Sequence, residues 1–223
     1  MIGIVDYGMG NLRSVQKALQ SHGADARIVT APAELPDAEK IVLPGVGAFE
    51  DAIARLREHR LAEPICAAIA AGTPFLGICL GYQMLFERSY ENGEHTGLGV
   101  LGGEVVRFDF ADVPDAASLR VPHMGWNQLR PRREGCPLLA GVADGEYMYF
   151  AHSFHAAPSE ADVVLTETDY GYPFASSVWR ENLFATQFHP EKSQAVGLAM
   201  VRNFVSHVVA CADGPSLTLG NTS

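Results

Sequence analysis

The fold is decided by nine residues at positions 75–83, Phe75-Leu76-Gly77-Ile78-Cys79-Leu80-Gly81-Tyr82-Gln83. The first four form a short apolar run, which is typical of a strand buried on both faces. A helical segment from Tyr82 to Phe86 follows, and a glycine stands two residues before and two residues after Cys79. This is the cysteine version of the G-x-S-x-G nucleophile elbow, in which small residues flank a strained strand-to-helix turn. Because a helix N-terminus favours the thiolate, we predict that Cys79 is a nucleophile rather than a buried structural cysteine.

Upstream of this stretch, short apolar strands alternate with amphipathic helices. Strands are predicted at 2–5, 26–29 and 40–43, and helices at 12–19, 49–56 and 61–71. The stops are supplied by Gly23, Pro44-Gly45 and Gly72. Such an alternation favours an α/β fold, with an open, mostly parallel sheet and helices on both faces.

Downstream of residue 99, the pattern changes to strands separated by turns. They are predicted at 100–109, 127–129, 147–150, 163–166, 175–179 and 183–188. The Pro and Gly content between them indicates hairpins, which we place as an antiparallel edge of the main sheet. One last amphipathic helix is predicted at 194–210. We find no repeat and no linker, so we expect one domain at 1–212 and a polar, frayed tail at 213–223.

The charge balance argues against several classes of function. The chain of 223 residues has 16 Lys and Arg against 26 Asp and Glu, a formal net charge of −10. A nucleic-acid binder needs a basic surface, so we expect no nucleic-acid partner. We expect no membrane association either, because no apolar run reaches the roughly 18–20 residues of a span and the N-terminus lacks a basic start. Four cysteines without C-x-x-C spacing indicate a reduced, cytoplasmic protein, with Cys66 and Cys211 buried on helix faces.

A nucleophile needs a base and a group that orients the base. The sequence Phe188-His189-Pro190-Glu191-Lys192 offers both, directly after a predicted strand. In a parallel sheet, this strand end brings His189 to the same carboxyl edge as Cys79, where such folds bind ligands. Glu191 can then accept a hydrogen bond from the other ring nitrogen. A surface histidine beside a surface glutamate is the alternative, and the nearby elbow disfavours it.

Covalent attack also requires donors for the developing oxyanion. The elbow itself positions the backbone N–H of Leu80. Pro44-Gly45-Val46-Gly47, at the end of the third strand, can bring a second N–H close because glycine lets the backbone approach. The alternative reading of these four residues is a plain strand-to-helix turn.

Two cofactor readings are weak. Gly8-Met9-Gly10 follows a strand as in a dinucleotide fingerprint, but Arg13 occupies the third glycine position and Thr30 the acidic one. His152 and His155 could be half a metal site, but they lack partners at ligand spacing. We therefore expect no cofactor and no metal.

With these pieces placed, the chain resembles the class I (triad) glutamine amidotransferases. The matching motifs are P-G-V-G at 44–47, G-I-C-L-G-Y-Q at 77–83 and F-H-P-E-K at 188–192. The resemblance implies a flavodoxin-like fold and a triad of Cys79, His189 and Glu191. It also implies that Gln83 and Gly45 hold the substrate glutamine, and that Leu80, Val46 and Gly47 form the oxyanion hole.

Within this family, the chain is similar to the glutaminase subunits of imidazole glycerol phosphate synthase, from histidine biosynthesis. The specific motifs are V-D-Y-G-M-G-N-L at 5–12, V-P-H-M-G-W-N at 121–127, Y-F-A-H-S-F at 149–154 and H-P-E-K-S at 189–193. Met148 stands where the subfamily often has tyrosine, and Tyr82 where it often has methionine. We expect neither departure to affect the chemistry.

That similarity implies a heterodimer with a (β/α)8-barrel cyclase subunit, which receives ammonia released from glutamine. It implies interface roles for Trp126, Lys192, Asn11 and Tyr149. Trp126 could otherwise be a core residue, and Lys192 a solvated one. The open alternatives are a subunit feeding anthranilate, carbamoyl phosphate, purine or pyridoxal phosphate synthesis, a stand-alone cysteine hydrolase, and a degenerate binding subunit.

Overall fold

A twisted eight-stranded sheet runs through the centre of the computed structural model, which describes residues 1–114, 116 and 119–206. Its strand order is β2-β1-β3-β4-β14-β13-β12-β9. The five parallel strands are β2 (Ala26–Val29), β1 (Ile2–Val5), β3 (Lys40–Gly45), β4 (Phe75–Cys79) and β14 (Leu183–Thr186). The antiparallel edge is β13 (Pro173–Arg180), β12 (Val164–Asp169) and β9 (Arg130–Pro131). The predicted parallel sheet with an antiparallel edge is therefore confirmed.

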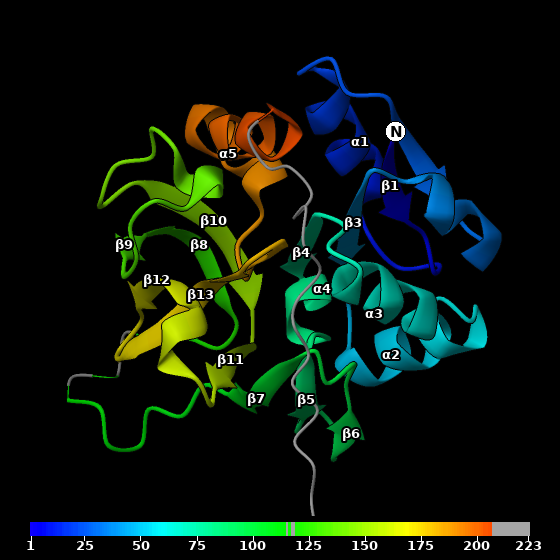
Figure 1. The fold of residues 1–223 in the computed structure, drawn as a ribbon. Coiled ribbons are helices and arrows are strands. Elements are labelled where there is room, and N and C mark those ends of the chain that lie inside the picture. The colour runs from blue at the N-terminus through cyan, green and yellow to red at the C-terminus, as the bar shows by residue number, and fades with distance from the viewer. Residues whose placement is uncertain (115, 117–118, 207–223) are drawn as a thin grey trace, which may run out of the picture.

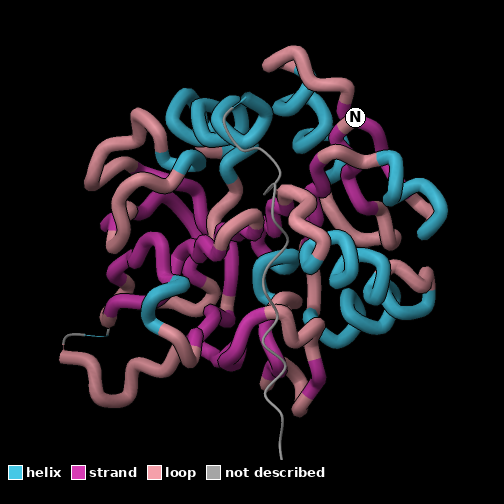
Figure 2. Tube along the Cα trace, in the orientation of Figure 1, coloured by secondary structure: helices cyan, strands magenta, loops and turns pink. Residues whose placement is uncertain are grey.

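Helices cover both faces of the sheet (Figure 1). On one face, α1 (Leu12–Gln20) and α5 (Gln194–Ser206) pack Val15, Leu19, Met200 and Phe204 against apolar side chains of β1, β3 and β4. On the other face, α2 (Phe49–Glu58) and α3 (Ala62–Ala70) bury their own apolar side chains. Strand residues alternate between these two cores, so the central strands read as continuous apolar runs. In Figure 2 the helices lie along the top and the right of the molecule, and the strands of the smaller sheets extend beyond them.

Two smaller sheets correct the prediction that all later strands lie at the edge of the main one. A two-stranded sheet pairs β8 (His123–Gln128) with β10 (Tyr147–His152). A four-stranded sheet has the order β11 (Phe154–Pro158), β7 (Leu101–Arg107), β5 (Phe86–Ser89) and β6 (His95–Thr96). Short 3-10 helices lie at Pro32–Asp37 (η1), Pro137–Leu139 (η3), Ala161–Val163 (η4) and Pro190–Lys192 (η5).

The helix after the elbow is shorter than predicted. It is α4 (Leu80–Gln83), and Phe86 already begins β5. Every residue from Leu80 to Phe86 is buried, so the segment lacks the polar face that separates a helix from a buried strand in sequence. Strand β3 is longer than predicted, because Pro44 and Gly45 continue its pairing with β4.

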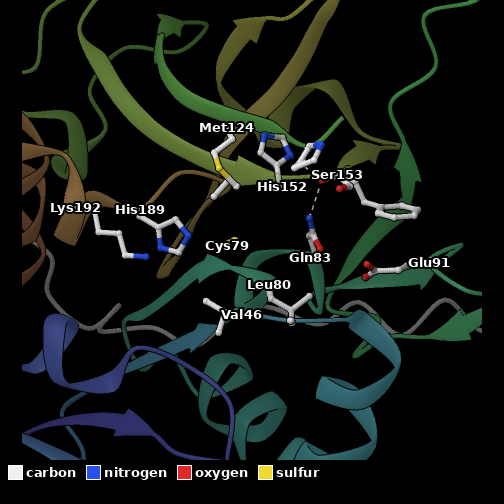
Figure 3. A pocket seen from close by; sticks show the side chains of 14 residues that line it. Val46, Cys79, Leu80, Gln83, Glu91, Met124, His152, Ser153, His189 and Lys192 are labelled. Carbon is white, nitrogen blue, oxygen red and sulfur yellow. Dashed lines mark hydrogen bonds between the residues drawn. The ribbon is translucent and has the colours of Figure 1, made fainter. Parts of the chain in front are cut away.

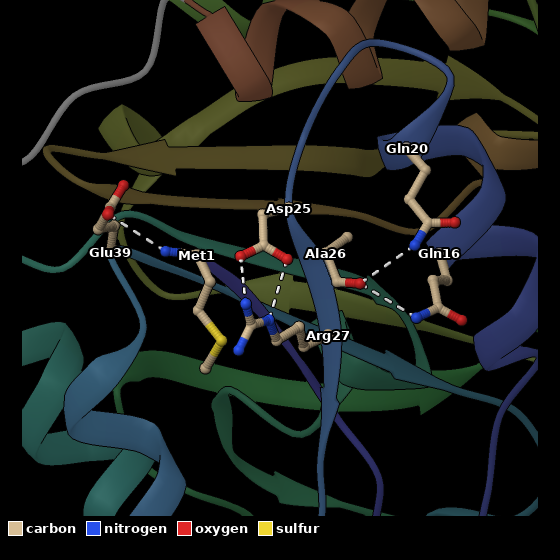
Figure 4. A network of polar contacts seen from close by, with 7 residues as sticks. All are labelled: Met1, Gln16, Gln20, Asp25, Ala26, Arg27 and Glu39. Atoms are coloured by element: carbon tan, nitrogen blue, oxygen red, sulfur yellow. Dashed lines mark hydrogen bonds and ion pairs between the residues drawn. The ribbon is translucent and has the colours of Figure 1, made fainter.

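Side-chain hydrogen bonds attach α1 to the edge strand β2 (Figure 4). The Ala26 carbonyl accepts hydrogen bonds from Gln16 Nε2 at 3.0 Å and Gln20 Nε2 at 3.4 Å. Beside them, Arg27 pairs with Asp25 at 2.9 Å on the exposed edge. Such exposed ion pairs contribute little stability, so the amide contacts and the α1 core hold this edge.

Some sequence predictions lie outside the described residues: the helical positions 207–210, Cys211 and the tail 213–223. Cys66, Cys79 and Cys136 are free thiols. Over the ranges 1–114, 116 and 119–206, no helix is long and apolar enough to span a membrane.

Candidate active site

Cys79 stands at the junction of β4 and α4 in a strained backbone conformation, with φ 55° and ψ −105°. A non-glycine residue in this region costs about 1–3 kcal/mol, so its surroundings must hold it there. The flanking glycines permit this. A Cβ at Gly77 would lie 2.9 Å from the Gly81 carbonyl oxygen, and one at Gly81 would overlap the Leu43 carbonyl oxygen. The predicted elbow is present, with close backbone contacts at the glycines on both sides of Cys79.

His189 and Glu191 lie beside Cys79, as predicted. His189 Nδ1 is 2.9 Å from Glu191 Oε1, and the two side chains are 4% and 2% exposed. Burial lowers the pKa of His189, but hydrogen bonds and charge from Cys79 and Glu191 outweigh it and raise that pKa to about 9. Because Glu191 occupies Nδ1, the other nitrogen of His189 is left to face the sulfur. The three residues are therefore arranged as nucleophile, base and orienting carboxylate.

The backbone around His189 is tied to strand β10. The His189 N–H donates to the Tyr149 carbonyl at 3.0 Å. The Ser193 hydroxyl donates to the His189 carbonyl at 2.6 Å and accepts from the Tyr149 N–H at 3.0 Å. This closed set of hydrogen bonds fixes the loop that carries His189 on the two-stranded sheet.

A cavity of about 310 Å³ opens over Cys79 (Figure 3), at the small end of the roughly 300–1,000 Å³ typical of ligand sites. His189 and Lys192 line one side of it, and Glu91 lines the other. The Cys79 sulfur and the Glu91 carboxylate therefore face one cavity from different directions.

The proposed oxyanion residues Val46, Gly47 and Leu80 line this cavity. Leu80 is the first residue of α4, so its N–H adjoins the nucleophile. Gly47 has φ 101°, a conformation that glycine adopts without strain. Gly45 packs beneath the elbow instead, where a Cβ would lie 2.5 Å from the Tyr7 hydroxyl and 2.9 Å from Leu80 Cβ. Gly45 is not among the residues that line the cavity, and its role in binding glutamine stays a prediction.

Tyr7 is a further residue of this region that sequence reasoning did not assign. Its side chain is fully buried, and its hydroxyl donates to the Pro44 carbonyl at 3.1 Å. Burial, and then the charges of Cys79 and Asp6, raise the pKa of Tyr7, so the hydroxyl keeps its proton. Tyr7 therefore anchors the strand end that leads into Val46 and Gly47.

Gln83 lines the cavity, as predicted, but its amide nitrogen is already used. Gln83 Nε2 donates to the Phe154 carbonyl at 2.8 Å and to Gln187 Oε1 at 3.0 Å. Its oxygen is the atom left for a ligand. Gln187 Nε2 in turn lies 3.8 Å from Cys79 Sγ.

Sequence reasoning missed Gln187, Glu91 and the cavity-facing role of His152. Gln187 directly precedes the F-H-P-E-K motif, which was the one available signal. Glu91 accepts the Phe49 N–H at 2.8 Å through Oε2 and lies in a loop without a motif. Within the described residues, no three His, Cys, Asp or Glu side chains are grouped so that they could hold a metal ion.

An aromatic surface cluster adjoins the site. Trp126 is 45% exposed and packs edge-on against Tyr149 at 6.0 Å between ring centroids. The ring centroids of Tyr149 and His189 are 6.4 Å apart, and Lys192 Nζ lies 6.0 Å from the centroid of the Tyr149 ring. Trp126 is on strand β8, just ahead of the strand predicted at 127–129. Asn11 precedes α1 and is exposed.

Comparison with known proteins identifies relatives along nearly the whole chain. The class-I glutamine amidotransferase family matches residues 3–208. The imidazole glycerol phosphate synthase subunit HisH of Syntrophotalea carbinolica is 50% identical over 204 residues, or 92% of this chain and 98% of that protein. The HisH subunit of Rhodopirellula baltica is 50% identical over 212 residues, or 95% of this chain and 100% of that protein.

Solved structures of lower identity share the fold. PurLQS from Thermotoga maritima has a TM-score of 0.70 at 22% identity, covering 92% of this chain and 96% of that one. The crystal structure of a glutamine amidotransferase gives 0.69 at 20% identity, with the same coverages. The motifs, the elbow geometry and these relatives agree: the chain belongs to the class-I glutamine amidotransferase family, and within it to the HisH subunits of imidazole glycerol phosphate synthase.

Proposed function

We propose that this chain releases ammonia from glutamine and passes it to the cyclase subunit of imidazole glycerol phosphate synthase. The observation that carries this proposal is the cysteine held at the strained elbow beside the buried His189–Glu191 pair. The sequence identity to HisH subunits supports the choice of acceptor reaction.

Because the pKa of His189 is raised to about 9, His189 holds its proton before the reaction, and acylation begins when the Cys79 sulfur attacks the substrate carboxamide carbon as the thiolate. The oxygen becomes negatively charged, and backbone N–H groups from Leu80 and the Val46–Gly47 segment stabilise it. One such donor is typically worth about 10²–10³ in rate. Glu191 stabilises the imidazolium of His189 and holds its orientation.

Collapse of this intermediate breaks the C–N bond. Protonated His189 gives its proton to the leaving nitrogen, which departs as ammonia and leaves a γ-glutamyl thioester on Cys79. His189 then takes a proton from water, and the resulting hydroxide attacks the thioester. The C–S bond then breaks, glutamate leaves, the Cys79 thiolate forms again and His189 keeps the proton, so the net reaction converts glutamine and water into glutamate and ammonia.

The far side of the cavity is suited to the amino-acid end of glutamine. Gln83 presents its oxygen there, and Glu91 contributes a carboxylate whose Oε2 is anchored by the Phe49 N–H. Two acceptors, one of them anionic, match the α-ammonium group. A substrate held at that end extends its carboxamide toward Cys79.

The (β/α)8-barrel cyclase binds the surface formed by Trp126, Tyr149 and Lys192. Asn11 is assigned to the same interface. An exposed tryptophan is a common interface anchor. Lys192, a cation at this surface, would pair with a carboxylate of the cyclase. A sheltered passage is useful, since ammonia in bulk water is protonated and loses its nucleophilicity.

The experiment measures glutamate release by the chain alone and with the cyclase subunit and its nucleotide ligand. We expect strong stimulation by both. In the complex, Cys79→Ala is expected to abolish glutamine-dependent synthesis and leave ammonia-dependent synthesis intact, because only the ammonia source is lost. Steady activity indifferent to the cyclase would assign the chain to another amidotransferase reaction. Loss of ammonia-dependent synthesis in an intact complex would contradict the proposal that this chain supplies only the ammonia.

A further inference from the structure

A line of hydrogen bonds connects strand β8 with the nucleophile, and its anchor is the carbonyl of Phe154. This oxygen is 2.8 Å from Gln83 Nε2 and 2.8 Å from His152 Nδ1. A carbonyl can only accept, so both neighbours must donate to it. His152 therefore carries a proton on Nδ1.

The remaining proton positions follow from that one. Neutral His152 has an acceptor at Nε2, and His123 Nδ1 lies 2.9 Å from it, so His123 donates there. His123 Nε2 is then the acceptor for Asn127 Nδ2 at 3.3 Å, and Asn127 Nδ2 also donates to the Asp169 carbonyl at 2.8 Å. Every donor in the series points toward Phe154, and both histidines hold the Nδ1–H tautomer.

The surroundings keep these rings neutral. His123 is 3% exposed and lies between the rings of Phe150 and Tyr170, with centroids at 4.8 and 4.0 Å. Burial lowers the pKa of His123 to about 4, and that of His152 to about 3. The other titratable groups facing His152 are His155 and His189, whose positive forms disfavour a further charge there.

On the other side of the Phe154 carbonyl, the donor and acceptor assignments also fix the orientation of the Gln83 and Gln187 side-chain amides. Gln83 gives one N–H to Phe154 and the other to Gln187 Oε1. Gln187 must then turn its nitrogen toward Cys79 Sγ. A reversed Gln83 would place its oxygen against the Phe154 carbonyl, so the fixed carbonyl excludes it.

We propose that His123 and His152 are positioning residues: their fixed tautomers hold the Phe154 carbonyl as the anchor that turns the Gln83 oxygen toward substrate and the Gln187 nitrogen toward the nucleophile. His123 lies one hydrogen bond behind the cavity and acts through His152. The link to substrate rests on the proposed glutamine reaction, whereas the tautomers do not.

The first test reads the tautomers directly, with no need for activity. In protein labelled with ¹⁵N-histidine, correlation spectra of the ring nitrogens distinguish Nδ1–H from Nε2–H. We expect His123 and His152, identified by loss of their signals in His123→Phe and in His152→Gln, to remain neutral Nδ1–H tautomers from pH 8 to pH 5. An Nε2–H tautomer or an imidazolium at neutral pH would overturn the proposal.

The second test separates positioning from packing in the cyclase complex. His123→Phe keeps a ring between Phe150 and Tyr170 but removes the donor, and we expect KM for glutamine to rise about tenfold, with kcat changed less than about threefold. His123→Asn restores a donor near the Nδ1 position and should recover part of the loss. His155→Phe is the matched control, because this histidine is 6% exposed in the same cluster but bonds to Ala156 and Tyr172.

Equal glutamine kinetics in His123→Phe and His155→Phe would overturn the positioning role. So would full retention of the defect in a folded His123→Asn protein. If the wild-type complex shows no glutaminase activity at all, the proposed function fails, while the tautomer measurement still decides the proton positions.

Discussion

At the scale of single residues, Tyr7 links the end of the first strand to the proposed oxyanion segment Val46–Gly47. Its hydroxyl is the donor to the Pro44 carbonyl, just ahead of Val46 and Gly47. We expect Tyr7→Phe to cost about 1–2 kcal/mol of unfolding free energy, because a buried carbonyl loses a partner. We also expect kcat for glutamine to fall about tenfold with KM nearly constant, since an oxyanion donor shifts.

Tyr82→Phe is the matched control for that substitution. Tyr82 is also fully buried, and its hydroxyl donates to the Ala175 carbonyl at 3.1 Å, on a strand that does not lead to the oxyanion segment. Chemical denaturation and steady-state kinetics should show similar stability losses for the two variants, but a kcat defect only for Tyr7→Phe. A kcat defect shared equally by both would assign Tyr7 a purely structural role.

His189, with Cys79 and Glu191 beside it, gives the stability of the fold a defined pH dependence. Because folding raises the pKa of His189 to about 9, the folded state binds this proton more tightly than the unfolded state. The contribution of this proton to the free energy of unfolding is complete below the pKa of His189 in the unfolded state, about 6.5. It declines as pH rises and is lost above about pH 9. We expect urea unfolding between pH 6.5 and 9 to show this decline, and Glu191→Gln to flatten it.

Glu58→Gln, which changes an exposed carboxylate at the end of α2, controls for net charge. It should keep the wild-type decline. The same slope in Glu191→Gln and wild type would show that the pair does not stabilise the fold through this proton.

At the scale of elements, the close approach of α4 to β3 makes Gly81 a steric requirement. In an ordinary helix, Gly to Ala stabilises by about 1 kcal/mol. Here the added Cβ would overlap the Leu43 carbonyl, so we expect Gly81→Ala to destabilise by about 3 kcal/mol, measured by denaturant unfolding. Gly141→Ala, with φ 76° and open space around its Cβ, should cost only about 1 kcal/mol. Equal losses in the two would contradict the steric argument.

The local sequence pattern was sufficient to place β1, β2 and the start of α2. Strands β1 and β2 begin and end where the apolar runs do, and α2 starts at the predicted Phe49. The local sequence pattern failed where tertiary contacts determine the boundaries of an element. β5 follows α4 without a polar face to mark the change, and β8 begins at His123, four residues before the predicted strand.

The candidate site divides in the same way. Cys79, His189 and Glu191 are visible in sequence because strained turns and short-range pairing leave motifs. Gln187, Glu91 and His152 act through partners far along the chain, such as the 104 positions between Gln83 and Gln187. Which side-chain atoms meet across that separation is a property of the folded sheet, and no local spacing encodes it.

At the scale of the whole molecule, the site opens beside an apolar surface on an otherwise acidic chain of net charge −10. Met124, Trp126 and Tyr147 are 65%, 45% and 53% exposed there. We expect Trp126→Ala to weaken binding of the cyclase at least about 30-fold, as removal of an interface anchor does, with unfolding free energy changed by less than about 1 kcal/mol. Calorimetric titration measures the affinity.

Arg27→Ala, on the edge strand β2, removes a comparably exposed side chain and should bind normally. Unchanged affinity and unchanged glutaminase stimulation in Trp126→Ala would place the cyclase on another face. A large stability loss would mean that Trp126 belongs to the core of the two-stranded sheet.

The ring series Trp126–Tyr149–His189 also gives the protein a natural fluorophore at the edge of its active site. The chain has two tryptophans, and the other, Trp179, stacks on Phe184 at 6.3 Å. In a Trp179→Phe protein, all indole emission would therefore originate at Trp126. Its emission maximum would shift when a partner displaces water from that surface, and its emission intensity would follow the charge on the nearby imidazole of His189. Partner binding and protonation of His189 would then both be measurable by the fluorescence of one unlabelled side chain.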